Sequence, residues 1–129
     1  MSSINSHKDL LIWKKGIDLV LKVYELTKSF SSEELFSITN QIKRAAISIP
    51  SNIAEGYGRN TEKSFSHYIN ISRGSLCELE THLIIAKELS FNNNFELYEE
   101  ILNLIIEESK KQSYNDIKDI MKNLKFTFK

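Results

Sequence analysis

Apolar residues recur every three or four positions over two long stretches of the chain, which is the spacing of one buried face of an α-helix. The first stretch contains Leu35, Ile38, Ile42, Ala45, Ala46, Ile49 and Ile53. The same spacing in the second stretch selects Phe65, Tyr68, Ile69, Ser72, Leu76, Leu79, Leu83 and Ala86. The chain has only one proline and four glycines, so few residues interrupt regular structure. We therefore predict an all-α fold of long helices joined by short loops.

The capping residues indicate where the helices begin. Ser31 and Glu34 have the spacing of a capping box, and Asn60 and Thr61 precede the second apolar stretch. Helices are predicted over about 8–28, 32–55, 61–90 and 95–121, followed by a short C-terminal tail. Such helices are typical of an up-down-up-down four-helix bundle with left-handed packing. A chain of 129 residues with 41% hydrophobic content can fill one core, so residues 1–129 are expected to form a single domain.

The only proline lies in the segment ISIPSNIAEGYGR, inside the second predicted helix. A proline there removes a backbone N–H and presses on the carbonyl four residues earlier, so we expect a kink at Pro50. Gly56 and Gly58 are expected to take left-handed conformations that end the helix and reverse the chain. A second interpretation stays open, because the turn, with Arg59 and Lys63 beside the next helix N-terminus, is also suited to binding a phosphate.

The net charge of the chain is zero, but the charges are unevenly distributed. Residues 41–73 hold five basic and two acidic side chains, whereas residues 78–119 hold ten acids and four lysines. A basic stretch of this kind suits an anionic partner. It also suits ion pairs between helices or subunits, which Arg44 or Arg73 would form with acids such as Glu78.

Two of the predicted helices carry more apolar surface than one seam of a bundle can bury. The first has two apolar stripes about 120° apart around its axis, and the apolar arc of the fourth is wider still. An apolar flank left on the surface marks a contact with a partner. We therefore predict self-association, or a protein partner, through Ile12, Leu19, Val23, Leu97, Ile101 and Leu104. The alternative is that loops or the tail cover these flanks.

No residue pattern in the sequence indicates catalysis or metal binding. The three histidines lie outside HExxH or CxxC spacing, and Glu78 with His82 is a single pair without a second ligand set. Cys77, the one cysteine, is expected to be a buried reduced thiol. We expect no enzyme activity, no metal and no cofactor. Because no signal-peptide pattern and no apolar run of membrane-spanning length is present, we expect no membrane association and a cytoplasmic location.

Three segments of the sequence resemble one known family. They read LLIWKKGIDLVLKVYELTKSF, QIKRAAISIPSNIAEGYGR and FSHYINISRGSLCELETHLIIA, and they lie within residues 8–92. They are similar to the four-helix-bundle proteins encoded within intervening sequences of bacterial large-subunit ribosomal RNA, and to accessory proteins of diversity-generating retroelements. The resemblance implies a ring-like homopentamer that associates with RNA. The basic positions that would contact nucleic acid are Lys43, Arg44, Arg59, Lys63 and Arg73.

Two functional hypotheses follow. The first is a non-enzymatic, oligomeric four-helix bundle associated with RNA or another nucleic acid. The alternative is a protein-interaction scaffold that presents its acidic fourth helix and the tail residues Phe126 and Phe128 to another protein, without binding nucleic acid. A net charge of zero is unusual for a dedicated nucleic-acid binder. Because binding through phosphates weakens steeply with salt, a salt series separates the two hypotheses.

Overall fold

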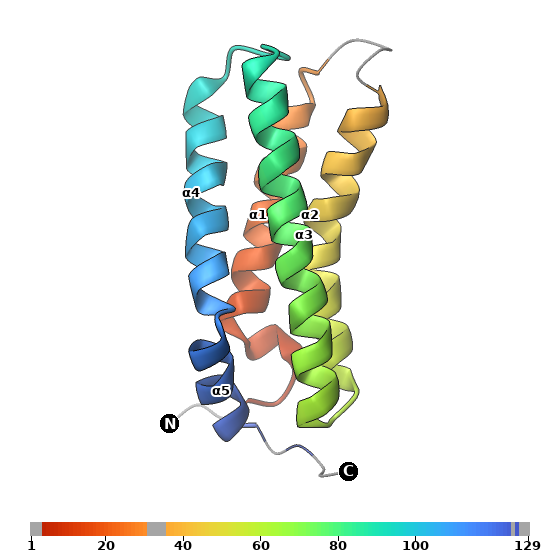
Figure 1. Cartoon of the computed structure of the whole chain (residues 1–129), viewed down its shortest axis with the longest axis vertical. Helices are drawn as coiled ribbons and strands as arrows, with labels where there is room; N and C mark the ends of the chain where they lie inside the picture. Colours follow the sequence, from red (N-terminus) through yellow and green to blue (C-terminus); the bar gives the residue numbers. More distant parts are fainter. Residues whose placement is uncertain (1–3, 31–35, 125, 127–129) are drawn as a thin grey trace.

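The computed structural model describes residues 4–30, 36–124 and 126 and shows a bundle of helices (Figure 1). No strand occurs in these described ranges, so the predicted all-α fold is confirmed. The elements are the 3₁₀ turn η1 (His7–Asp9) and the helices α1 (Leu11–Thr27), α2 (Phe36–Gly58), α3 (Glu62–Glu88), α4 (Phe95–Lys111) and α5 (Tyr114–Lys122). None of the described helices is both long enough and apolar enough to cross a membrane.

The long helices lie side by side and alternate in direction along the chain (Figure 1). Between α2 and α3, the Ser72 hydroxyl donates a hydrogen bond of 3.2 Å to the carbonyl of Ile49. The two ion pairs that join α1 to α4 in opposite directions, each with an N–O distance of 3.6 Å, are Lys15–Glu107 and Lys22–Glu100. The left-handed packing of these helices stays a prediction.

The first and fourth predicted helices have different bounds in the structure. The first α-helix begins at Leu11 rather than near residue 8, because Ser6 and Asp9 form a capping box around η1. The fourth predicted helix is wrong as one element, because α4 ends at Lys111 and α5 begins at Tyr114. Ser113 starts the new helix, since its side chain accepts a hydrogen bond of 3.4 Å from the backbone N–H of Asp116.

The cap predicted for α3 is confirmed. The Thr61 hydroxyl accepts a hydrogen bond of 3.1 Å from the backbone N–H of Ser64, which satisfies one of the unpaired donors at the helix start. The capping box predicted at Ser31 and Glu34 lies outside the described residues.

Helix α2 continues through Pro50 as far as Gly58, beyond the predicted end at residue 55. The expectation that Gly56 and Gly58 adopt left-handed conformations is wrong, because no described glycine has a positive φ and Asn60 takes that role with a φ of 63°. A Cβ added at Gly56 would lie 2.9 Å from the Cβ of Tyr68 on α3. Gly56 is therefore needed for close approach of α2 to α3, and the kink at Pro50 stays a prediction.

Pro50 also lies at a close contact between helices. A Cβ added at Gly16 of α1 would lie 3.3 Å from the Cβ of Pro50. Gly16 and Pro50 are both buried. The glycine thus lets α1 approach the proline ring of α2, which holds the two backbones close together at this level of the bundle.

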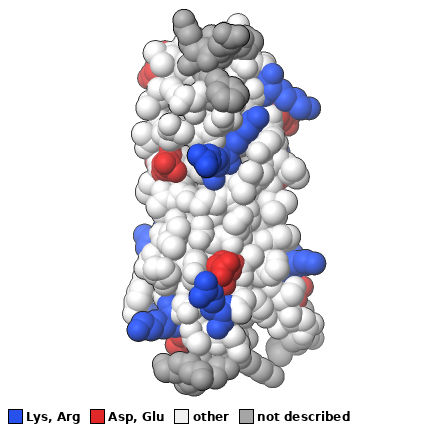
Figure 2. All heavy atoms as spheres, turned by 90° about the vertical axis from the view of Figure 1, so that its right-hand side faces the viewer, with Lys and Arg blue, Asp and Glu red and all other residues white. Residues whose placement is uncertain are grey.

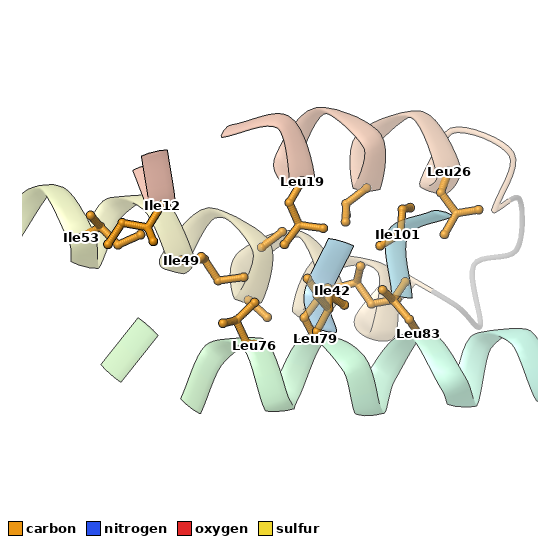
Figure 3. Packing of buried hydrophobic residues seen from close by; sticks show 14 of the residues in the cluster. Ile12, Leu19, Leu26, Ile42, Ile49, Ile53, Leu76, Leu79, Leu83 and Ile101 are labelled. Atoms are coloured by element: carbon orange, nitrogen blue, oxygen red, sulfur yellow. The ribbon is translucent and has the colours of Figure 1, made fainter. Parts of the chain in front are cut away.

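The core runs along the bundle axis and receives side chains from all four long helices (Figure 3). Figure 3 shows Leu19 of α1, Ile49 of α2, Leu79 of α3 and Ile101 of α4 pointing toward a common interior. Each of these side chains is completely shielded from solvent. Burial of such aliphatic side chains is the main source of stability of the bundle.

Candidate functional site

The residues predicted to form an oligomer interface lie mostly inside the single-chain core. Leu104 is half-buried and packs against the core. The other five have exposed fractions of at most 7%: Ile12, Leu19, Val23, Leu97 and Ile101. The prediction that these side chains face outward is therefore wrong. The period of the apolar pattern defines two stripes on α1 but does not say which of them faces the bundle interior.

The apolar stripe of α1 that contains Trp13, Ile17 and Val20 is the one that borders solvent. It forms one wall of a shallow, largely apolar groove, here named the α1–α2 groove, whose lining residues are Trp13, Ile17, Val20, Ile47, Pro50, Ser51 and Ala54. Ile47 is 43% exposed, and Leu21 on the same flank of α1 is 63% exposed. Figure 2, which faces the side of the bundle where α2 lies, shows few charged side chains across its middle.

A second hollow extends along α2 toward the α2–α3 turn, where two of the predicted basic residues lie. Arg59 lines this hollow together with Glu55. The Arg59 Nε donates a hydrogen bond of 2.8 Å to Glu55 Oε2, and its guanidinium lies 5.2 Å from the centre of the Tyr68 ring. The bond to Glu55 raises the pKa of Arg59, so this side chain stays charged. Lys63 is exposed in the first turn of α3, just beyond the same turn.

The structure does not gather the five predicted nucleic-acid-binding residues into one patch. Lys43 lies over the Tyr24 ring of α1, with its Nζ 5.0 Å from the ring centre. Arg44 is exposed on α2 at a distance of about 22 Å along the helix axis from Arg59. Arg73 is exposed on α3. Arg59 forms an ion pair with Glu55. Among the described residues, none of the ion pairs includes Arg44 or Arg73.

The other polar residues considered for chemistry are dispersed. Ser75 donates a hydrogen bond of 2.8 Å to Ser48, so it serves the packing of α3 on α2. The expectation of a buried thiol is wrong, because Cys77 is exposed. His82 is partly buried, and its Nδ1 has no hydrogen-bond partner. Within the described part of the chain, no group of three or more His, Cys, Asp and Glu side chains is arranged to hold a metal ion.

Sequence reasoning missed two buried polar residues on α4. Glu108 and Gln112 are each 1% exposed, and Gln112 Nε2 donates a hydrogen bond of 3.0 Å to Glu108 Oε2. Burial raises the pKa of Glu108 from 4.5 to about 7, while the hydrogen bond from Gln112 and the charges of Lys15 and Lys111 act in the opposite direction. The signal was present in the spacing, because these two positions continue the core seam of α4 that includes Ile105.

The comparisons with known proteins agree with this fold. A family model described as 23S rRNA-intervening sequence protein matches residues 8–124. The chain belongs to this family. The match continues past residue 92, where the resemblance in the sequence became weak, and includes α4 and α5.

One solved structure similar to the chain is a protein of unknown function from the S23 ribosomal protein family of Bacteroides thetaiotaomicron. It has 24% sequence identity and a TM-score of 0.73, and the alignment covers 82% of this chain and 98% of that one. At this identity the likeness supports the fold alone. The comparison with curated proteins finds no match.

Proposed function

We propose that this chain is a non-enzymatic, self-associating helical bundle that acts in the cytoplasm. The observation that carries the proposal is the α1–α2 groove, which leaves Trp13, Ile17 and Ile47 open to solvent on one face. A contiguous apolar surface on a soluble protein is a typical protein–protein contact. The subunit already has a complete core of its own, so this surface is not needed to fold the single chain.

A ring of five subunits is the form of assembly we propose. The resemblance noted in the sequence supports this number, and a cyclic ring requires that the contact surface of each subunit meet a different surface of the next. The groove is shallow and nearly uncharged, so its contact would rest on apolar burial. Because such burial depends little on ionic strength, the assembly is expected to persist at high salt.

The proposed contact is tested by placing a charge in the groove. Ile47→Glu puts a carboxylate at a 43% exposed position of the groove, where it would have to be desolvated on assembly. We expect the parent protein to appear as a pentamer in native mass spectrometry and light scattering, and the variant as a monomer with unchanged helical circular dichroism.

Ile47→Val is the matched control, because it keeps an uncharged apolar side chain at the same exposed position of the groove. This variant is expected to stay assembled. A monomeric parent protein, or assembly retained by Ile47→Glu, would contradict the proposed contact.

Nucleic-acid binding at the α2–α3 turn is the second candidate function. It is favoured by the exposed cations of Arg59 and Lys63, which flank the N-terminus of α3, where unpaired backbone N–H groups attract anions. The family description, which refers to 23S rRNA, agrees with an RNA partner. The scaffold without nucleic-acid binding is the competing hypothesis.

A salt series with structured RNA distinguishes these hypotheses. If Arg59 and Lys63 each neutralise one phosphate, replacing both with glutamine should reduce the slope of log K against log salt concentration by about 2. Replacing Arg44 and Arg73 with glutamine is the matched control, because both are exposed and lie away from the turn. An unchanged slope in the Arg59 and Lys63 variant would contradict binding at the turn, and no binding at low salt would favour the scaffold.

A further inference from the structure

The corner between α4 and α5 contains a buried acid paired with a buried amide. Gln112 is the C-cap of α4, and Ser113 is the N-cap of α5, so the two helices meet directly beyond this pair. Glu108 lies one turn earlier on the same face, and both it and Gln112 are 1% exposed. The pair therefore lies inside the bundle, at the place where the chain changes direction.

The hydrogen bonds of this pair are incomplete when Glu108 is ionised. Gln112 Nε2 donates to Glu108 Oε2 at 3.0 Å, while the Oε1 atom of each side chain is buried without a partner. Both Oε1 atoms are acceptors in that state, and a buried acceptor without a donor is costly. A proton taken from solvent by Glu108 Oε1 would create an O–H donor, and Gln112 Oε1 is a buried acceptor that lacks one. The neutral acid and the amide would then share two hydrogen bonds.

The surrounding charges do not remove the cost of ionising Glu108. The present hydrogen bond from Gln112 favours the carboxylate, as do the charges of Lys15 of α1 and Lys111 of α4, but burial outweighs all three. Lys15 is also engaged with Glu107, at an N–O distance of 3.6 Å. All the buried residues of α3 are uncharged. The charged side chains of α5 are exposed, and they are Asp116, Lys118, Asp119 and Lys122.

We propose that Glu108 and Gln112 form a proton-controlled latch, in which protonation of Glu108 closes the two-hydrogen-bond pair and holds the α4–α5 corner, and loss of that proton to solvent releases α5. This inference does not depend on self-association or on RNA binding. It gives the bundle one helix whose docking responds to pH.

Helix α5 is short and has few anchors in the bundle. It has nine residues and one buried side chain, Ile117, while Ile120 and Met121 are partly buried against the core. The Ser66 hydroxyl of α3 also donates a hydrogen bond of 3.7 Å to the Met121 sulfur. Because a helix shorter than about 12 residues is marginal in water by itself, the docking of α5 depends on these contacts together with the corner from which it starts.

The direction of the pH effect follows from the two states of Glu108. Its pKa is about 7 with the corner closed, and its ordinary value of 4.5 applies when the corner is open to water. Since the closed corner favours the protonated acid, closure is strongest below the ordinary value and weakens as the pH rises. The opening constant of α5 should rise about tenfold per pH unit between these two values and then level off.

Hydrogen exchange of the backbone amides tests the latch on the full chain. After correction for the intrinsic exchange rate at each pH, protection of Tyr114–Lys122 in the parent protein should fall between about pH 5 and pH 7. In Glu108→Gln the new amide donates permanently to Gln112 Oε1, so protection should be high and independent of pH. Glu96→Gln, at an exposed position on the same helix, should keep the parent profile.

One further measurement makes the test decisive. Carbon-13 NMR of the Glu108 side-chain carboxyl reports its titration directly in the parent protein, even if a variant folds poorly. A midpoint near the ordinary value would overturn the proposal. So would a loss of protection equal in α3 and α5, or the same pH profile in Glu108→Gln and the parent.

Discussion

Leu19→Ala should lower the free energy of unfolding by about 2–5 kcal/mol. Leu19 is completely buried where α1 meets the core. Truncation at this site removes apolar contacts and leaves a cavity among close-packed helices. Urea unfolding followed by circular dichroism measures the loss, and the protein concentration should be held constant because self-association would add to the apparent stability.

Leu21→Ala is the matched control for this prediction. Leu21 is 63% exposed and lies only two residues further along the same helix. In an Ile47→Glu background, where the proposed groove contact is removed from both proteins, its truncation should change the free energy of unfolding by less than about 0.5 kcal/mol. Equal losses for the two variants would mean that the inner and outer stripes of α1 have been assigned incorrectly.

Gly56→Ala is expected to destabilise the bundle even though alanine favours helices. The added Cβ would lie 2.9 Å from the Cβ of Tyr68 and 3.3 Å from the backbone Cα of Phe65. A backbone atom cannot turn aside as a side chain can, so α2 and α3 must separate, at a cost of about 1–3 kcal/mol. The gain in helix propensity, about 1 kcal/mol, offsets only part of that cost.

Gly74→Ala measures the effect of helix propensity on stability without a packing clash. Gly74 is an exposed residue inside α3, and a Cβ there would meet no atom within 4 Å. This variant should therefore gain about 1 kcal/mol in the free energy of unfolding. Thermal unfolding of the parent protein and both variants should show a lower melting temperature for Gly56→Ala and a higher one for Gly74→Ala. A Gly56→Ala variant as stable as Gly74→Ala would contradict the close contact between α2 and α3.

The core seams of α2 and α3 were predictable from the sequence. From Ile42 to Ile53 and from Ile69 to Ala86, the residues selected by the three-and-four spacing are buried. Each of these helices has one apolar stripe, so the sequence alone determines which face of the helix points inward. Helix α1 has two apolar stripes, and which of them faces inward depends on where α2 and α4 lie. The apolar period of α1 alone carries no information about those positions.

The glycine prediction failed for a related reason. Glycine commonly ends a helix in a left-handed conformation, so the pair in IAEGYGR was interpreted as a local signal. Gly56 is instead required by Tyr68, which is twelve residues away in sequence and lies on the next helix. Because this requirement comes from another helix, the sequence around Gly56 does not distinguish a glycine needed for close packing from a glycine that ends a helix.

The candidate site was predictable only in part. The sequence places Arg59 and Lys63 beside one turn, and the structure agrees. The basic stretch as a whole does not become one patch, because successive side chains of a helix point in different directions and Arg44 is separated from Arg59 by several turns. Glu108 was visible as a charged residue at a seam position, but its burial depends on the helices that pack around it.

Consecutive long helices of this chain pack against one another, so most of its contacts form between segments that are close in sequence. Helical proteins of this kind fold in about microseconds to milliseconds, whereas a ribosome adds only about 5–20 residues per second. The α1–α4 seam, with its Lys15–Glu107 and Lys22–Glu100 pairs, is the exception, because it joins the beginning of the chain to a late helix. During synthesis, the inner face of α1 must therefore wait for α4 to leave the ribosome, and translation sets the time at which the bundle closes.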